Sequence, residues 1–263
     1  MKKQKSFSIE LTSEELIAAI KLCGGGLIYA LDNPLRLLEA EQAEKIELKA
    51  IENLTQKGLI RKDALGSYAM DLTFSEVLDM MRYAETVVRV SQEGKLESFS
   101  IYLISEDQVV WAPAGEKSKL VVFKDHDSIW PMAEELFQNK SIAIKKGSFQ
   151  IEALELEIAQ HFLSEKRFED AIKVFTEKEI PSDDAADFLN CVQSANSKIR
   201  LDTMKVNRIE DVITSTKVEV LSCPNGIFWI EYLQKFEEND LWMVQISSGE
   251  IRDIREKFLS LIA

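Results

Sequence analysis

The sequence lacks the short motifs that mark the common classes of enzyme. It contains no GxSxG, HExxH, GxxxxGK[ST] or GxGxxG pattern, and only two histidines. His126 stands in Lys-Asp-His-Asp, where the aspartates offer metal ligands, but a second spaced pair is missing and a solvated turn is the simpler interpretation. His161 lies beside Phe162 on an expected helix that also carries Leu154 and Ile158, where a core-edge or surface histidine is a simpler interpretation than a catalytic base. We therefore expect no enzyme activity, no cofactor and no metal.

Cysteine and long apolar runs are also scarce. The three cysteines, Cys23, Cys191 and Cys223, are widely spaced and form no CxxC pair, which indicates buried thiols in a reducing compartment. A catalytic thiol stays open as an alternative, because its partners can come from distant parts of a chain. No run approaches the roughly 20 apolar residues of a membrane span, and no apolar segment of a secretory signal follows the basic start. These absences predict a cytoplasmic protein without membrane insertion.

Positive charge is in short supply as well. The chain has 32 basic and 45 acidic residues, a net charge of −13. Residues 1–70 hold ten of each, so the whole excess falls on the remainder. Nucleic acids are polyanions and would be repelled by this charge. We therefore expect a protein partner and no nucleic acid.

A long amphipathic segment, residues 37–73, organises the N-terminal half. Apolar residues recur at helical spacing up to Leu54, and Gly58 stands where a left-handed helix cap belongs. A short polar turn follows, and Thr73-x-x-Glu76 predicts the start of a second helix, as the capping box Thr12-x-x-Glu15 does for a short helix earlier in the chain. This layout is winged-helix-like and leaves a DNA-binding regulator as the alternative function. Its recognition helix, residues 74–83, offers Arg82 as the only base, which argues against it.

The rest of the chain alternates between the apolar spacing of a helix and the apolar spacing of a strand. Residues 85–123 read as antiparallel strands, and a closing helix starts at Asp127 or Ser128. The polar stretch 139–147 is the best boundary, which gives halves 1–140 and 141–263. The second half predicts helices at 151–162, 167–176 and 182–195, a possible helix at 205–213, two strand hairpins, and a last helix at 251–261 capped by Ser247-x-x-Glu250.

The two halves share one plan. Each has helices, antiparallel strands and a closing helix, with Trp111 and Trp229 at like places. We predict an α+β fold, an antiparallel sheet flanked by helical bundles, in which the halves form a quasi-two-fold pair within one compact domain.

Aromatic residues concentrate in the second half. Apolar side chains on both faces of the hairpin after Gly226 mean that it is covered on both sides or that one face meets a partner. Most of these aromatics fit a core, and an exposed one would anchor an interface. The candidate partner-binding residues are Phe162, Phe168, Phe228, Trp229, Tyr232 and Trp242.

The order of features resembles the EspG-type chaperones of type VII (ESX-like) secretion systems. The matching segments are the helix opening Leu11-Thr12-Ser13-Glu14-Glu15-Leu16, the segment Pro34-Leu35-Arg36, the helix end Lys57-Gly58-Leu59-Ile60, the helix through Met80-Met81, and the strands Val87-Val88-Arg89-Val90 and Val109-Val110-Trp111-Ala112-Pro113.

This resemblance covers the first half by motif and the second half by architecture. It implies the quasi-two-fold fold and a cytosolic chaperone or adaptor that binds a helical secretion substrate before export, with transient contact to the secretion machinery. The composition, rich in Lys, Glu and Ile, departs from the actinobacterial members and looks like that of a low-GC Gram-positive (Firmicutes-like) source. The implied partner is then a WXG100- or LXG-like helical protein instead of a PE–PPE pair.

Overall fold

A computed structural model gives the fold of the chain. The structure describes residues 7–25, 28–94, 98–104, 107–114, 117–137, 147–207, 212–224, 226–234 and 242–262. The expected boundary between residues 140 and 141 lies outside these ranges. The chain divides into two compact units: unit 1 is Met1–Arg89, Glu97–Ser128 and Lys205–Ile213, and unit 2 is Val90–Leu96, Ile129–Met204 and Thr214–Ala263.

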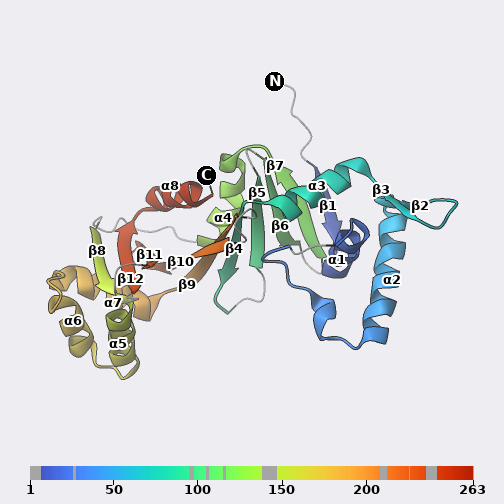
Figure 1. Cartoon of the computed structure of the whole chain (residues 1–263). Helices are drawn as coiled ribbons and strands as arrows, with labels where there is room; N and C mark the ends of the chain where they lie inside the picture. The colour runs from blue at the N-terminus through green and yellow to red at the C-terminus, as the bar shows by residue number, and fades with distance from the viewer. Residues whose placement is uncertain are drawn as a thin grey trace. The chain divides into compact units, whose positions relative to one another are not determined.

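Unit 1 contains an antiparallel sheet in the order β1-β7-β6-β5-β4 (Figure 1). Ile101 and Tyr102 are consecutive in β5, point to opposite faces, and are both fully buried. Both faces of this sheet are therefore covered. The strands are β1 (Ser8–Leu11), β4 (Thr86–Gln92), β5 (Ser98–Ile104), β6 (Asp107–Ala114) and β7 (Lys117–Phe123), and β4 has its first four residues in this unit.

A capping box begins the first helix of unit 1, as predicted. Glu15 N–H donates to Thr12 Oγ1 at 3.2 Å, and Thr12 N–H donates to Glu15 Oε2 at 2.9 Å. Glu15 is almost fully buried, and Lys57 Nζ pairs with its Oε2 at 2.5 Å, so its charge is compensated. The elements are α1 (Ser13–Leu22), η1 (Pro34–Leu37), α2 (Ala40–Gln56), β2 (Ile60–Lys62), β3 (Tyr68–Met70), α3 (Leu72–Tyr83) and η2 (His126–Ile129), the last ending in unit 2.

The segment from α2 to α3 confirms one predicted cap and corrects another. Gly58 has φ +74°, and Leu59 N–H donates to Leu54 O at 3.0 Å, which closes α2. The polar turn that follows is the hairpin β2–β3. The predicted start at Thr73 is wrong. Asp71 caps α3, because its carboxylate accepts the Phe74 N–H at 3.1 Å, and Thr73 already lies inside the helix.

In unit 2 the strands of the antiparallel sheet follow the order β9-β10-β11-β12-β8 (Figure 1). Phe228 and Ile230 of β11 face the helices α5, α6 and α7, whereas Trp229 faces α8, where Lys257 Nζ lies 5.7 Å from its ring centroid. The hairpin is thus covered on both sides. The elements are α4 (Trp130–Phe137), β8 (Gly147–Glu152), α5 (Ala153–Ser164), α6 (Phe168–Thr176), α7 (Ser182–Ser194), β9 (Ser197–Asn207), β10 (Val212–Cys223), β11 (Gly226–Gln234), β12 (Trp242–Gly249) and α8 (Ile251–Leu261).

Four phenylalanine rings join the helices of unit 2 to its sheet. Phe188 of α7 lies 5.5 Å from Phe228 of β11 and 5.9 Å from Phe175 of α6, measured between ring centroids. Phe149 of β8 lies 5.9 Å from Phe175 and 6.1 Å from Phe188. Edge-to-face aromatic pairs add about 0.5–1.5 kcal/mol each to the burial of their apolar area. This aromatic cluster fixes α6 and α7 on the sheet.

Two predictions for the second half are wrong. The possible helix at 205–213 is strand instead: β9 continues through Asn207 and β10 starts at Val212, with 208–211 outside the described residues. Val206 N–H donates to Glu85 O at 2.8 Å, as a strand residue does. Ser247 does not cap the last helix, because it pairs with Trp229 inside the sheet, and Glu250 takes that position. The α+β class with antiparallel sheet and flanking helices is confirmed.

The cap at Gly58 gives a stability prediction. Gly58→Ala forces a Cβ onto a left-handed backbone and should lower the free energy of unfolding by about 1 kcal/mol. Nothing lies within 4 Å of the added Cβ, so the loss comes from backbone strain alone. Gly58→Asn is the matched variant and should lose less, since Asn tolerates this region better. Urea unfolding measures both, and equal losses would contradict the strain argument.

Candidate partner-binding surface

The outer face of α5 carries apolar side chains that the core does not use. Leu156, Ala159 and Leu163 face inward and are buried. Leu154 and Ile158 lie on the opposite side, one helical turn apart, and are 62% and 39% exposed. A helix on the surface of a single protein has one apolar face and one polar face. α5 instead has apolar side chains on its outward face as well as on its inward face.

A tryptophan near the first turn of α5 is exposed as well. Trp242 begins β12 and is 43% exposed. Side chains alternate along a strand, so Trp242 lies on the same face as Val244 and Ile246, which pack against α5–α7. Met243 pairs with Glu152, the residue before α5, which places the backbone of Trp242 beside the first turn of α5. We call Leu154, Ile158 and Trp242 the apolar ridge.

A groove of about 420 Å³ lies along the other flank of α5. Gln160 of α5 and Val192 of α7 contribute to its walls, and Leu221 and Ile230 of the sheet line it as well. The remaining lining residues are Glu93, Ala195, Asn196, Ser197, Lys198 and Glu219. All of them belong to unit 2. The groove is therefore a mixed polar and apolar depression next to the apolar ridge.

The charges within this groove are balanced. Glu219 is only 6% exposed, and its carboxylate pairs with Lys217 at 2.6 Å and Lys198 at 3.5 Å. Tyr232 lies against the same carboxylate, with Lys217 Nζ 4.4 Å from its ring centroid. Burial raises the pKa of the Tyr232 phenol, and the negative charge of Glu219 raises it further. These contacts position the Tyr232 side chain as a rigid wall of the surface.

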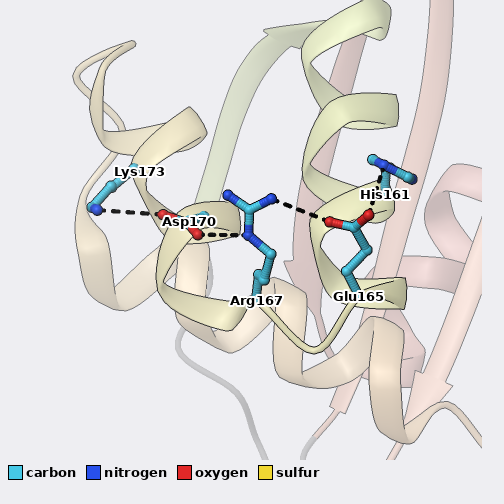
Figure 2. Close-up of polar contacts among 5 residues, drawn as sticks. All are labelled: His161, Glu165, Arg167, Asp170 and Lys173. Carbon is cyan, nitrogen blue, oxygen red and sulfur yellow. Dashed lines mark hydrogen bonds and ion pairs between the residues drawn. The ribbon is translucent and has the colours of Figure 1, made fainter.

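A chain of ion pairs fixes the corner between α5 and α6 (Figure 2). Arg167 contacts Glu165 at 3.2 Å and Asp170 at 2.9 Å, and Lys173 contacts Asp170 at 3.4 Å. His161 Nε2 lies 3.4 Å from Glu165 Oε1. Arg167, then Lys173, hold the pKa of Asp170 below its usual range. Exposed pairs contribute little to stability, so the effect of this network is to orient the corner.

The six aromatic residues predicted to bind a partner differ widely in exposure. Phe228 and Trp229 are each 2% exposed and belong to the core of unit 2. Phe162, Phe168 and Tyr232 are half-buried against the same core, and Arg167 covers the Phe162 ring at 4.4 Å. Among the six, Trp242 is the exposed one.

Sequence reasoning missed Leu154 and Ile158 as surface residues. They were assigned to the helix that carries His161, but not to its outer face. The signal was available: once Leu156, Ala159 and Leu163 are taken as the inward face, residues 154 and 158 fall opposite them at 100° per residue.

The other candidates from the sequence have ordinary surroundings. Cys191 and Cys223 are buried in the core of unit 2, where burial raises the pKa of the Cys191 thiol and disfavours the reactive thiolate. Arg82 of α3 is engaged, with Nη1 3.1 Å from Cys23 O and 3.2 Å from Asp79 Oδ1. The side chain of His126 lies outside the described residues.

Two searches of the described residues gave negative results. Within these ranges, no group of three or more His, Cys, Asp and Glu residues is arranged to hold a metal ion. None of the helices in the described part of the chain is long and apolar enough to span a membrane.

The phenol of Tyr232 gives a pH prediction. Its folded pKa lies above the ordinary value of about 10, so its contribution to stability is complete below pH 10 and is lost above it, at about 1.4 kcal/mol per pH unit. Tyr232→Phe should therefore move the alkaline unfolding midpoint, followed by circular dichroism, to higher pH. Glu219→Gln should lower the Tyr232 pKa but leave it raised, because burial is the larger cause. An unchanged midpoint in Tyr232→Phe would contradict this assignment.

Comparisons with known proteins identify a structural neighbour. No protein-family model matches the sequence, and no curated protein matches it. The fold is similar to that of the Mycobacterium tuberculosis type VII secretion system chaperone EspG5, in a structure with the PE25–PPE41 dimer. The TM-score is 0.68 and the sequence identity 10%, and the similarity covers 97% of this chain and 95% of that chain. At this identity the comparison shows a shared fold, and the predicted EspG-like α+β fold is confirmed.

Proposed function

We propose that this chain is a cytoplasmic chaperone or adaptor that binds a helical substrate of a type VII (ESX-like) secretion system before export. The observation that carries the proposal is the fold shared with the secretion chaperone EspG5 over nearly the whole of both chains. The EspG5 structure holds a PE25–PPE41 dimer, so the same fold serves there to bind other proteins. Binding without catalysis agrees with the lack of enzyme motifs in the sequence.

We infer the substrate class from the composition of the chain, which is rich in Lys, Glu and Ile. A low-GC Gram-positive source would pair this protein with a WXG100- or LXG-like helical protein, and contact with the secretion machinery would be transient. The net charge of −13 favours a neutral or basic protein over nucleic acid. Arg82, the base of the alternative recognition helix, is already engaged by Cys23 and Asp79. This engagement gives the DNA-binding alternative no support.

The apolar ridge is the surface that we assign to the substrate. Leu154, Ile158 and Trp242 are exposed, and Tyr232 and Phe162 flank them with fixed side chains. Phe228 and Trp229, which are buried in the core of unit 2, would contribute indirectly by holding the sheet and helices in place. A specific complex buries about 800 Å² on each partner, so the contact would extend from the ridge onto its surroundings. Shielding an apolar helix of the substrate in this way would keep it from aggregating before export.

The double variant Leu154→Glu/Ile158→Glu should lose the substrate without losing the fold. Both side chains are exposed, so the charges cost little in the free protein, but in a complex they are buried without a partner. We expect affinity to fall at least about a hundredfold, or 2.7 kcal/mol. Size-exclusion co-elution and calorimetry with a WXG100- or LXG-like substrate encoded beside its gene measure this.

The matched control replaces exposed leucines of unit 1. Leu37 is 93% and Leu48 54% exposed, and Leu37→Glu/Leu48→Glu should leave binding within about twofold. Equal losses in both double variants would remove the ridge from the proposal. Failure of the wild type to co-elute with any such substrate would overturn the chaperone function itself.

A further inference from the structure

Negative charge is concentrated in α5, which carries Leu154 and Ile158 of the apolar ridge, and in the two helices that follow it, α6 and α7. Residues 153–194, from the start of α5 to the end of α7, contain ten acidic and four basic residues. The first 70 residues, by contrast, contain ten of each. A helical layer with this imbalance produces a negative potential over its surface.

Internal ion pairs leave most of this negative charge unneutralised. Arg167, Lys173 and Lys178 are each engaged with carboxylates of the same layer or of the adjoining strand end. Lys166 is the only base of the three helices without an ion pair to a described residue. Seven acidic residues likewise form no ion pair with any residue that the structure describes: Glu157, Glu169, Glu177, Glu179, Asp183, Asp184 and Asp187.

One of these free carboxylates borders the apolar ridge directly. Glu157 precedes Ile158 on α5 and is exposed. At 100° per residue it falls on the flank of α5 that faces Tyr232, between the ridge and the groove. Glu155 lies on the opposite flank, where Lys178 holds it. An apolar contact on α5 is therefore bordered by an uncompensated negative charge, Glu157, on one side. On the other side the negative charge of Glu155 is neutralised by Lys178.

We propose, building on the function proposed above, that the segment docking on the ridge is an amphipathic helix whose apolar stripe is bordered by lysine or arginine. The apolar stripe supplies the contact with Leu154 and Ile158, and the basic border meets Glu157 and the other free carboxylates. Charges arranged in this way speed encounter and reject wrong partners more than they add affinity. The outer face from residue 154 to residue 165 is about 16 Å long, which matches about three turns of a partner helix.

Two synthetic peptides test the charge of the partner. Both are helical, about 16 residues long, with the same leucine stripe, and differ only in lysine or glutamate at the bordering positions. Fluorescence anisotropy with the full chain should show the lysine peptide binding at least about tenfold more tightly at low salt, about 1.4 kcal/mol. The preference should shrink when salt is raised to about 0.5 M, because screening removes it.

Matched variants separate the local charge from the net charge. Glu157→Lys/Glu169→Lys should abolish or invert the preference, whereas Glu44→Lys/Glu52→Lys on exposed positions of α2 makes the same change in net charge and should leave it within about twofold. Leu154→Ser/Ile158→Ser should weaken both peptides. Thermal unfolding confirms that each variant is folded.

Three results would overturn the inference: a glutamate peptide that binds as tightly as the lysine peptide, a preference that the α2 variant changes as much as the α5–α6 variant, or no saturable binding of either peptide. The proposed function fails by a different result, the absence of any complex with a secretion substrate. If substrate binding depends on Leu154 and Ile158 but the lysine and glutamate peptides bind equally well, the proposed function stands. The inference that the partner helix has a basic border is then wrong.

Discussion

The packing of Phe149, Phe175, Phe188 and Phe228 is the interaction on which the candidate surface depends. Their rings lie 5.5–6.1 Å apart and come from a strand at the sheet edge, two helices and a central strand. Because the cluster takes up the inward faces of α6 and α7, these helices have a fixed place on the sheet. α5 packs against the same core through Leu156, Ala159 and Leu163, so its remaining apolar residues cannot turn inward.

The polar contacts of unit 2 serve the same rigidity. Glu219 would be costly in its nearly buried position without Lys198 and Lys217, and with them it becomes a support for Tyr232. At the α5–α6 corner, Arg167 joins two carboxylates and covers Phe162. A surface held in this way can bind a partner without first being ordered, which removes part of the entropic cost of association.

The candidate surface combines exposed apolar side chains with acidic side chains that form no ion pair to a described residue. In the proposed complex, leucine and isoleucine would supply a contact that is indifferent to partner sequence, and free carboxylates would supply discrimination by charge. A chaperone that had only the first would bind any exposed apolar helix. The net charge of −13 is unevenly placed, since the first 70 residues carry none of it.

The sequence alone determined the class and most elements of the fold, because those depend on local periodicity. Residues 153–164 alternate at helical spacing and Val218–Glu219–Val220 at strand spacing wherever they lie. Helix caps were predicted less reliably. The caps at Thr12 and Gly58 were predicted correctly, but Asp71 and Glu250 cap the helices for which Thr73 and Ser247 were expected. Several nearby polar side chains compete for the same N–H groups, and local sequence does not decide between them.

The tertiary structure decided which apolar residues are exposed. Phe228, Trp229 and Trp242 look alike as aromatic residues of one hairpin, yet the first two are buried between two helical layers and the third stands at the sheet end. Leu154 and Leu156 are two residues apart, yet Leu154 is exposed and Leu156 is buried, because the Phe175–Phe188 core meets only one side of α5. Burial depends on contacts between distant segments, and a local pattern does not contain them.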